Sequence, residues 1–149
     1  MIATPPAGWR ERAARAVAHG ERLDRLIPAA LLDSPISRLG YRWGTAVGFV
    51  WGALWSTGRV ERREGLWVFR GLPRWAFRRG GVCVGGCYLT GEGRVTDRVL
   101  RHEAVHAQQW RRYGVLMPVL YLLAGMDPLR NRFEILAGLE AGNYVPRGA

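Results

Sequence analysis

The stretch RHEAVHAQQW, residues 101–110, holds two of the three histidines in this chain of 149 residues. On a helix, positions 102, 103 and 106 fall within an arc of roughly 100°. Two neutral imidazoles can then reach one ion from successive turns, and the Glu103 carboxylate can reach a water molecule beside it. The spacing therefore predicts a metal site with His102 and His106 as ligands. The alternative is a pair of histidines hydrogen-bonded on a partly buried helix.

The sequence around this motif favours a helix over about 95–112. Thr96 or Asp97 can cap its start. The face of the histidines also carries large or apolar side chains, namely Val95, Val99, Trp110 and Tyr113. Arginines and Gln108 occupy a different face, which we expect to be solvated. The pattern is that of an amphipathic helix with the histidines on its inner side.

Composition indicates one globular domain spanning 1–149, since 48% of the residues are hydrophobic and 23% are charged. The formal charge of +10 comes from 22 cationic side chains, all arginine, against 12 acidic ones. Such a charge attracts polyanions and anionic membrane surfaces. Cys83 and Cys87 do not form a disulfide framework, and the N-terminus lacks the pattern of a secretory signal. We therefore expect a cytoplasmic protein, with association to a membrane left open.

The chain divides into four segments: a tail and helix over 1–33, a glycine-faced apolar helix over 34–57, a β-hairpin region over 58–93, and metal-site helices over 94–149. Within them we expect strands near 66–70, 75–78 and 82–90, and helices over about 95–112, 115–125 and 128–142. Gly85–Gly86 indicates a bulge or a close approach of another backbone. The predicted class is α+β, with a short antiparallel sheet of two to three strands.

The helix over 34–57 can be capped by Asp33 or Ser34, and Pro35 suits its first turn. Its glycines recur every four residues, at 40, 44, 48 and 52, and so share one face that lets another backbone approach closely. Between Arg42 and Arg59 lie 16 uncharged residues, slightly fewer than the roughly 17–25 of a membrane span. A buried helix is the favoured interpretation, and a membrane-inserted or membrane-lying helix is the alternative.

The segment VLRHEAVHAQ, residues 99–108, resembles the active-site helix of zincin metallopeptidases, in which uncharged residues flank H-E-x-x-H. Gln108 departs from that pattern, because a hydrophobic residue is usual there. No histidine follows His106, which excludes the metzincin arrangement. Downstream, Glu134-Ile135-Leu136-Ala137 resembles the E-x-x-A segment of gluzincins.

This resemblance implies a small bacterial gluzincin-like protein with a zincin-like domain. It would bind one Zn²⁺ through His102, His106 and Glu134, with Glu103 as general base. Glu140, Asp127 or no third ligand at all remain alternatives, and Glu134 could instead pair with Arg130 or Arg132 or face solvent. His19 lies far upstream, and we expect it to be an exposed helix residue.

Two features usual in gluzincins are missing. The position four residues after Glu134, where an aspartate often orients a metal-bound histidine, is Gly138. No histidine is available to stabilise an oxyanion, so the candidates for that task are Tyr121, Tyr144, Arg130 and Arg132. Asn131 is a candidate for holding a ligand in place.

Two functions follow as hypotheses. The first is a zinc-dependent peptidase acting on a peptide or protein, in which residues 82–89 pair with an extended substrate. The second is a non-catalytic basic protein that binds nucleic acid or an anionic membrane, with a structural or regulatory zinc site. It would use the Arg59–Arg79 region, where seven arginines alternate with Trp67, Phe69, Trp75 and Phe77.

Overall fold

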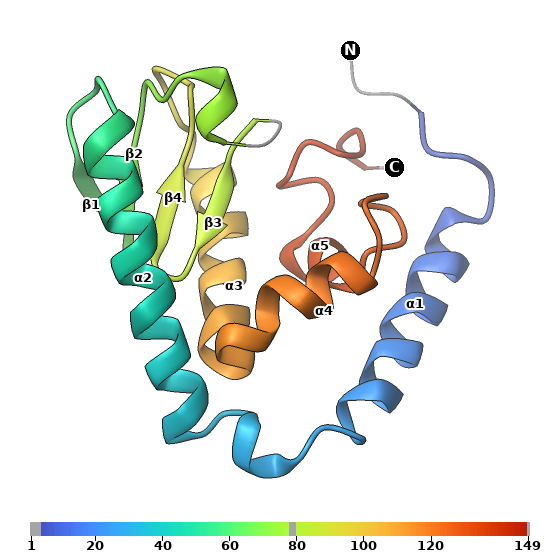
Figure 1. The fold of residues 1–149 in the computed structure, drawn as a ribbon. Helices are drawn as coiled ribbons and strands as arrows, with labels where there is room; N and C mark the ends of the chain where they lie inside the picture. The colour runs from blue at the N-terminus through green and yellow to red at the C-terminus, as the bar shows by residue number, and fades with distance from the viewer. Residues whose placement is uncertain (1–3, 78–79, 149) are drawn as a thin grey trace.

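The structure, a computed structural model, describes residues 4–77 and 80–148 (Figure 1). Within these ranges the α-helices are α1 Trp9–Asp24, α2 Pro35–Trp55, α3 Asp97–Tyr113, α4 Met117–Leu123 and α5 Arg132–Ala137. Three short 3₁₀ helices are η1 Ala29–Leu31, η2 Arg74–Ala76 and η3 Gly114–Leu116. The strands are β1 Glu61–Arg63, β2 Leu66–Phe69, β3 Val82–Val84 and β4 Cys87–Leu89. The predicted α+β class is confirmed.

The sheet has four strands in the order β1-β2-β4-β3 and is mixed, so the prediction of two to three antiparallel strands is wrong. The two outer pairings are antiparallel, whereas β2 and β4 are parallel, with Val68 opposite Tyr88. The difference arises at Gly85–Gly86. Gly85 has a φ of 57°, and here the chain reverses instead of bulging, which splits the expected strand 82–90 into a hairpin. The expected close approach does occur, because Gly85 lies against the backbone of Thr45 in α2.

Two other predicted elements differ from the structure. The expected strand at 75–78 is η2, a single 3₁₀ turn that starts after Pro73, and position 78 lies outside the described residues. The expected helix over 128–142 shrinks to α5, which ends where Gly138 takes a φ of 98°. From there the chain continues in turns.

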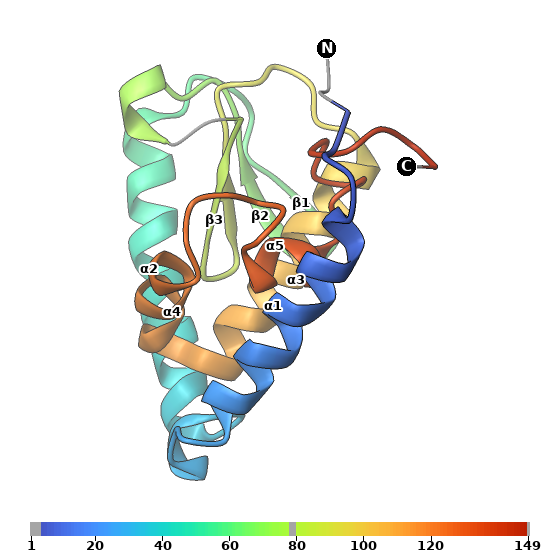
Figure 2. The same cartoon turned by 90° about the vertical axis from the view of Figure 1, so that its right-hand side faces the viewer.

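The sheet is sandwiched between α2 and α3 (Figure 2). Alternate strand residues point to opposite faces. Leu66, Val68 and Tyr88 pack with Leu100 and Ala107 of α3. On the other face, Cys87 lies against Gly48 and Phe69 lies against Gly52, both in α2. The strands are therefore buried on both sides, and α3 is held firmly against the sheet.

The glycine face of α2 packs on protein, whereas the apolar residues on its other side are exposed, so the expected buried helix is buried on one face. Its start is fixed by a capping box, in which Ser34 and Ser37 exchange side-chain-to-backbone hydrogen bonds of 2.9 and 3.1 Å. The backbone of Gly114 and Val115 lies directly against Gly40, and Trp110 lies against Gly44. Among the described residues, the structure contains no helix with the length and apolar character needed to cross a membrane.

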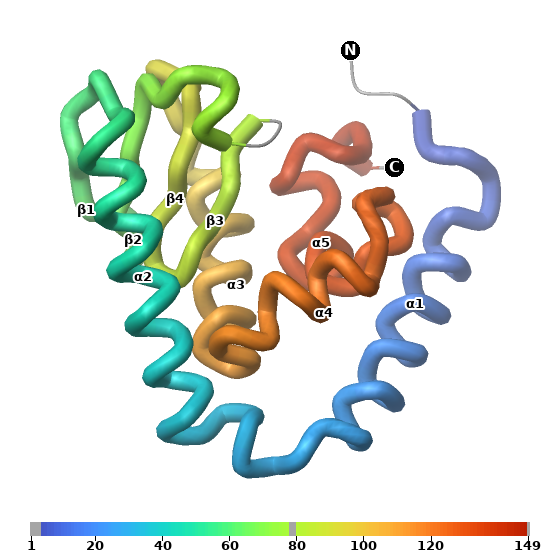
Figure 3. Tube along the Cα trace, in the orientation of Figure 1, coloured from blue at the N-terminus to red at the C-terminus, as the bar shows by residue number. Residues whose placement is uncertain are grey.

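The N-terminal helix supports the C-terminal part of the chain. Figure 3 shows that α1 and α2 diverge from the turn that joins them, with α3, α4 and α5 between them. The carboxylate of Asp24, at the end of α1, pairs with Arg132 at 2.8 Å and accepts a hydrogen bond of 2.5 Å from the Tyr113 hydroxyl. Because Arg132 and Asp24 are almost fully buried, this ion pair ties α5 to α1 and α3.

We predict that Gly40→Ala destabilises the protein by about 1–3 kcal/mol, because a Cβ at this position would lie 2.6 Å from the backbone nitrogen of Val115. Urea unfolding measures the change. Gly93→Ala is the matched control, since a Cβ there meets no atom within 4 Å, and we expect its effect to stay within about 0.5 kcal/mol. Equal stabilities for the two variants would contradict the close approach.

Candidate metal centre

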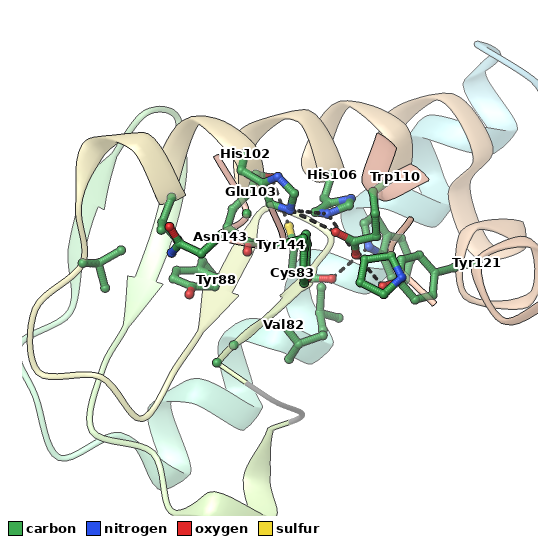
Figure 4. Close-up of a pocket in the computed structure, with 18 of the residues that line it drawn as sticks. Val82, Cys83, Tyr88, His102, Glu103, His106, Trp110, Tyr121, Asn143 and Tyr144 are labelled. Carbon is green, nitrogen blue, oxygen red and sulfur yellow. Dashed lines mark hydrogen bonds and ion pairs between the residues drawn. The ribbon is translucent and has the colours of Figure 1, made fainter. Parts of the chain in front are cut away.

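Helix α3 places His102 and His106 on successive turns of its buried face. Thr96 rather than Asp97 is the cap, and its side chain accepts a hydrogen bond from the Val99 backbone at 3.3 Å. The two histidines are 2% and 7% exposed, and their Nε2 atoms lie 3.1 Å apart. Figure 4 shows both rings projecting from α3 into a shared space.

Glu134 on α5 completes the cluster. Its Oε2 lies 3.1 Å from Nε2 of His102, and its Oε1 lies 3.5 Å from Nε2 of His106. One ligand atom from each of the three residues falls within 4.8 Å of the others, and all three side chains are buried. The three residues could therefore hold a metal ion.

Backbone carbonyls hold Nδ1 of His102, the ring nitrogen that faces away from the other two members of the cluster. Its Nδ1 lies 3.2 Å from the Ala137 oxygen and 3.1 Å from the Gly138 oxygen, and since carbonyls only accept, Nδ1 carries the proton. The lone pair of Nε2 then faces Glu134. Gly138 occupies the position where the resemblance led us to look for an aspartate. Its own carbonyl orients the histidine instead, because α5 ends there.

The outer nitrogen of His106 is fixed by Gln109, which the sequence analysis missed. The amide nitrogen of Gln109 donates to the Phe133 carbonyl at 3.0 Å, so its oxygen faces Nδ1 of His106, 2.8 Å away. Nδ1 therefore donates, and Nε2 again presents a lone pair. The i, i+3 spacing from His106 is the pattern that could have identified Gln109.

The donor set fits a metal ion on two grounds. A tetrahedral ion bound at about 2.1 Å holds its ligand atoms roughly 3.4 Å apart. The two separations from Nε2 of His102, 3.1 Å to Nε2 of His106 and 3.1 Å to Oε2 of Glu134, lie close to that value, and one ligand atom from each of the three residues lies within 4.8 Å of the others. In addition, two nitrogen lone pairs and a carboxylate converge in a buried space. Only a cation or an extra proton between them relieves their mutual electrostatic repulsion.

The carboxyl group of Glu134 is electrostatically well supported. Burial by itself raises its pKa, but the close contacts of the carboxylate with the His102 and His106 rings and the hydrogen bond from Tyr121 outweigh this effect and hold the pKa well below its usual range. The Tyr121 hydroxyl donates to Oε1. Glu134 is thus kept ionised, the state that metal coordination requires.

Glu103 lies next to the cluster, and its pKa is shifted in the opposite direction from that of Glu134. Burial raises its pKa, and the neighbouring histidines only partly offset the rise. Among the described residues its carboxylate makes no hydrogen bond or ion pair, although the side chain is only 8% exposed. It lines a cavity of about 1180 Å³ together with His102, His106 and Glu134. A carboxylate with these properties is suited to accept a proton.

Three other candidates lie near the cluster in different roles. Tyr121 contacts Glu134 as described, and Tyr144 lines the cavity with its ring edge-on to His102, 6.0 Å between centroids. Asn131 is buried and caps α5, while its amide donates to the carbonyls of Tyr121 and Gly125 at 3.2 and 2.7 Å. It holds the segment that carries Glu134 and touches neither histidine within hydrogen-bond distance.

The remaining candidates lie away from the cluster. Arg130 is exposed and pairs with Asp127 at 3.6 Å. Arg132 is buried against Asp24, so neither arginine neutralises Glu134. The exposed Glu140 accepts from the backbone of Gly148 at 3.2 Å, and His19 is exposed on α1.

The strand beside the cavity is β3, at the edge of the sheet, and its residues 82–84 line the cavity. Strand β4 lies between β2 and β3, so residues 87–89 cannot pair with a substrate. The Cys83 carbonyl accepts a hydrogen bond of 3.1 Å from the Trp110 indole. Cys83 and Cys87 are free and lie on the adjacent strands β3 and β4, because the expected strand 82–90 is divided into two.

In the Arg59–Arg79 region some side chains form ion pairs or are buried, and others are exposed. Arg70 pairs with Glu61 at 3.4 Å, and Arg63 pairs with Glu61 and Asp97. Phe69 is fully buried, whereas Trp75 is 63% exposed. The last two arginines of the region, at 78 and 79, lie outside the described residues.

Comparison with protein-family models, with curated proteins and with solved structures found no match to this chain. The candidate site therefore stands on its geometry: two oriented imidazoles and one buried carboxylate around a common point.

Proposed function

We propose that this protein is a zinc-dependent hydrolase that acts on peptides or proteins, with one Zn²⁺ held by His102, His106 and Glu134. The observation that carries the proposal is the convergence of two Nε2 lone pairs and a carboxylate, with both Nδ1 atoms committed to other acceptors. Imidazole and carboxylate ligands in a set of three, leaving a fourth position open, are typical of catalytic zinc.

Zinc bound in such a site would polarise a carbonyl group and lower the pKa of water to about 7. Glu103 would be the group that accepts a proton from the attacking water and passes it to the leaving amine. Its raised pKa supports this role, because a carboxyl group that is less acidic than usual holds the transferred proton more readily. Tyr144 is a candidate for the oxyanion, since it lines the same cavity as Glu103.

The form of the cavity supports a polypeptide substrate. An extended peptide can lie along the edge strand β3, where the backbone is the recognition element. The Cys83 carbonyl already accepts a hydrogen bond from the Trp110 indole. A substrate would therefore pair with fewer residues than the predicted stretch 82–89. Apolar side chains of the cavity, among them Val82, Val99 and Met117, favour apolar substrate residues near the metal cluster.

The first prediction concerns metal content. Elemental analysis of the purified protein should give about one zinc per chain, and His102→Ala and Glu134→Ala should each abolish it, because three ligands cannot be reduced to two without a large loss of affinity. His19→Ala and Glu140→Ala are matched controls, since both side chains are exposed and neither belongs to the group that could hold the metal ion. Zinc retained in the Glu134 variant would refute that ligand.

The second prediction separates catalysis from binding. Glu103→Gln should keep its zinc and lower peptide hydrolysis by at least about 10²-fold, because an amide cannot accept the proton. Turnover of a casein or peptide-library substrate is measured at equal zinc content. Undiminished cleavage would contradict the mechanism. Zinc without turnover in the unmodified protein would instead favour the structural or regulatory zinc site of the alternative hypothesis.

The third prediction tests the support of His106. Gln109→Ala should weaken zinc binding about 10–100-fold, since His106 loses the acceptor that fixes its tautomer. Competition with a chromophoric chelator measures the affinity. Gln108→Ala is the matched control, because Gln108 is exposed on the same helix and should leave the affinity unchanged. Equal affinities in both variants would show that Gln109 has no orienting role.

A further inference from the structure

The outer side of α2 carries an apolar stripe that no described part of the chain covers. Its members are 44–67% exposed and comprise Ile36, Leu39, Trp43, Val47, Val50 and Leu54. Their spacings of three and four residues place them on one side of the helix. A continuous row of this kind differs from the scattered apolar residues of an ordinary surface and marks an interaction site.

A tryptophan cluster adjoins the stripe at the C-terminal end of α2. The ring centroids of Trp51 and Trp55 lie 5.9 Å apart, and Trp75 of η2 lies 4.7 Å from Trp55. The three side chains are 39%, 39% and 63% exposed, and the Trp51 indole donates to the Ala76 carbonyl at 2.8 Å. Tryptophan is favoured at the level of lipid headgroups, because its ring is apolar and its N–H is polar.

The charged side chains of the segment that carries the stripe are all positive. Residues 34–60 contain three arginines and no acidic residue. Arg38, Arg42 and Arg59 are exposed and make no ion pair with any described residue. Arg42 is three residues from Leu39 and so borders the stripe. A second copy of this chain, also at +10, would bring the same positive charges to the contact, whereas an anionic surface complements them.

We propose that the stripe and the tryptophan cluster dock this protein on the surface of an anionic lipid bilayer, with α2 lying in the headgroup region. An amphipathic helix that combines apolar and aromatic residues with arginines binds membranes in this way. Trp43 also lines the metal-site cavity, as do the exposed Leu122 and Met126 of the α4 region. Docking therefore brings this side of the cavity close to the bilayer.

Vesicle flotation with the full chain tests the proposal. We expect binding to vesicles of equal parts phosphatidylglycerol and phosphatidylcholine, and much weaker binding to phosphatidylcholine alone. Leu39→Gln combined with Leu54→Gln should lower the partition coefficient at least about tenfold, because two side chains lose their transfer into the apolar layer. Leu23→Gln combined with Leu26→Gln is the matched control, since these leucines are 44% and 80% exposed on a different part of the surface.

A second variant tests the electrostatic part. Arg38→Gln combined with Arg42→Gln should lower binding to the anionic vesicles about tenfold, and added salt should reduce binding by the unmodified chain. Thermal unfolding confirms that each variant is folded. The measurements are repeated with a chelator present, because docking needs no bound metal and so fails or holds independently of the proposed hydrolase activity.

Three results would overturn the proposal. The first is an absence of binding to anionic vesicles. The second is vesicle binding that the Leu39/Leu54 variant retains in full, which would place the contact elsewhere, for example in the Arg59–Arg79 region. The third is a stable dimer without vesicle binding that the same variant dissociates, which would make the stripe a contact between two copies.

Discussion

The burial of the Glu134 carboxylate between two imidazoles is the constraint on which the C-terminal half of this protein depends. A buried charge must be paired, and every neighbouring element contributes to that pairing. Helix α3 supplies the imidazoles, and the hydroxyl of Tyr121 donates to the carboxylate. The short α5 holds Glu134 in place because Asn131 caps its start and Arg132 pairs with Asp24 of α1. The N-terminal helix thus stabilises the site without touching it.

The two sides of α2 have different physical roles. Its glycine side permits backbone and ring contacts that any larger residue would prevent, and these contacts fix the sheet and η3 against the helix. Its outer side is apolar without being covered. The same 21 residues therefore build the scaffold that positions α3 and present the surface that we assign to lipid. Both uses require a helix with small residues on one side and apolar residues on the other, which also explains why its sequence approaches that of a membrane span.

Prediction from the sequence succeeded where a local pattern has one physical solution. Ser34 and Pro35 define the start of α2, and the His102–His106 spacing puts both rings on one helix face. It failed where long-range contacts decide the outcome. The segment 82–90 is strand-like on both sides of Gly85–Gly86, a pair that permits either a bulge or a turn, and contact of Gly85 with Thr45 of α2 accompanies a reversal there. The parallel β2–β4 pair follows from that reversal. Gln109 was missed because its acceptor role depends on Phe133, 24 residues away.

The sequence by itself determined the α+β class, the glycine-faced helix and the pair of histidines, because helical periodicity and capping act within a few residues. Only the tertiary structure decided that Glu134, rather than Glu140 or Asp127, meets those histidines, and that backbone carbonyls at Ala137 and Gly138 replace an orienting aspartate. The physical reason is that the chain leaves the helical path at Gly138, where φ is 98°, and the Ala137 and Gly138 carbonyls both come to lie near Nδ1 of His102. A helix continuing to residue 142, as the periodicity indicated, would have bonded the Ala137 carbonyl to the backbone of residue 141, whereas the Gly138 carbonyl accepts from the Gly142 N–H even here.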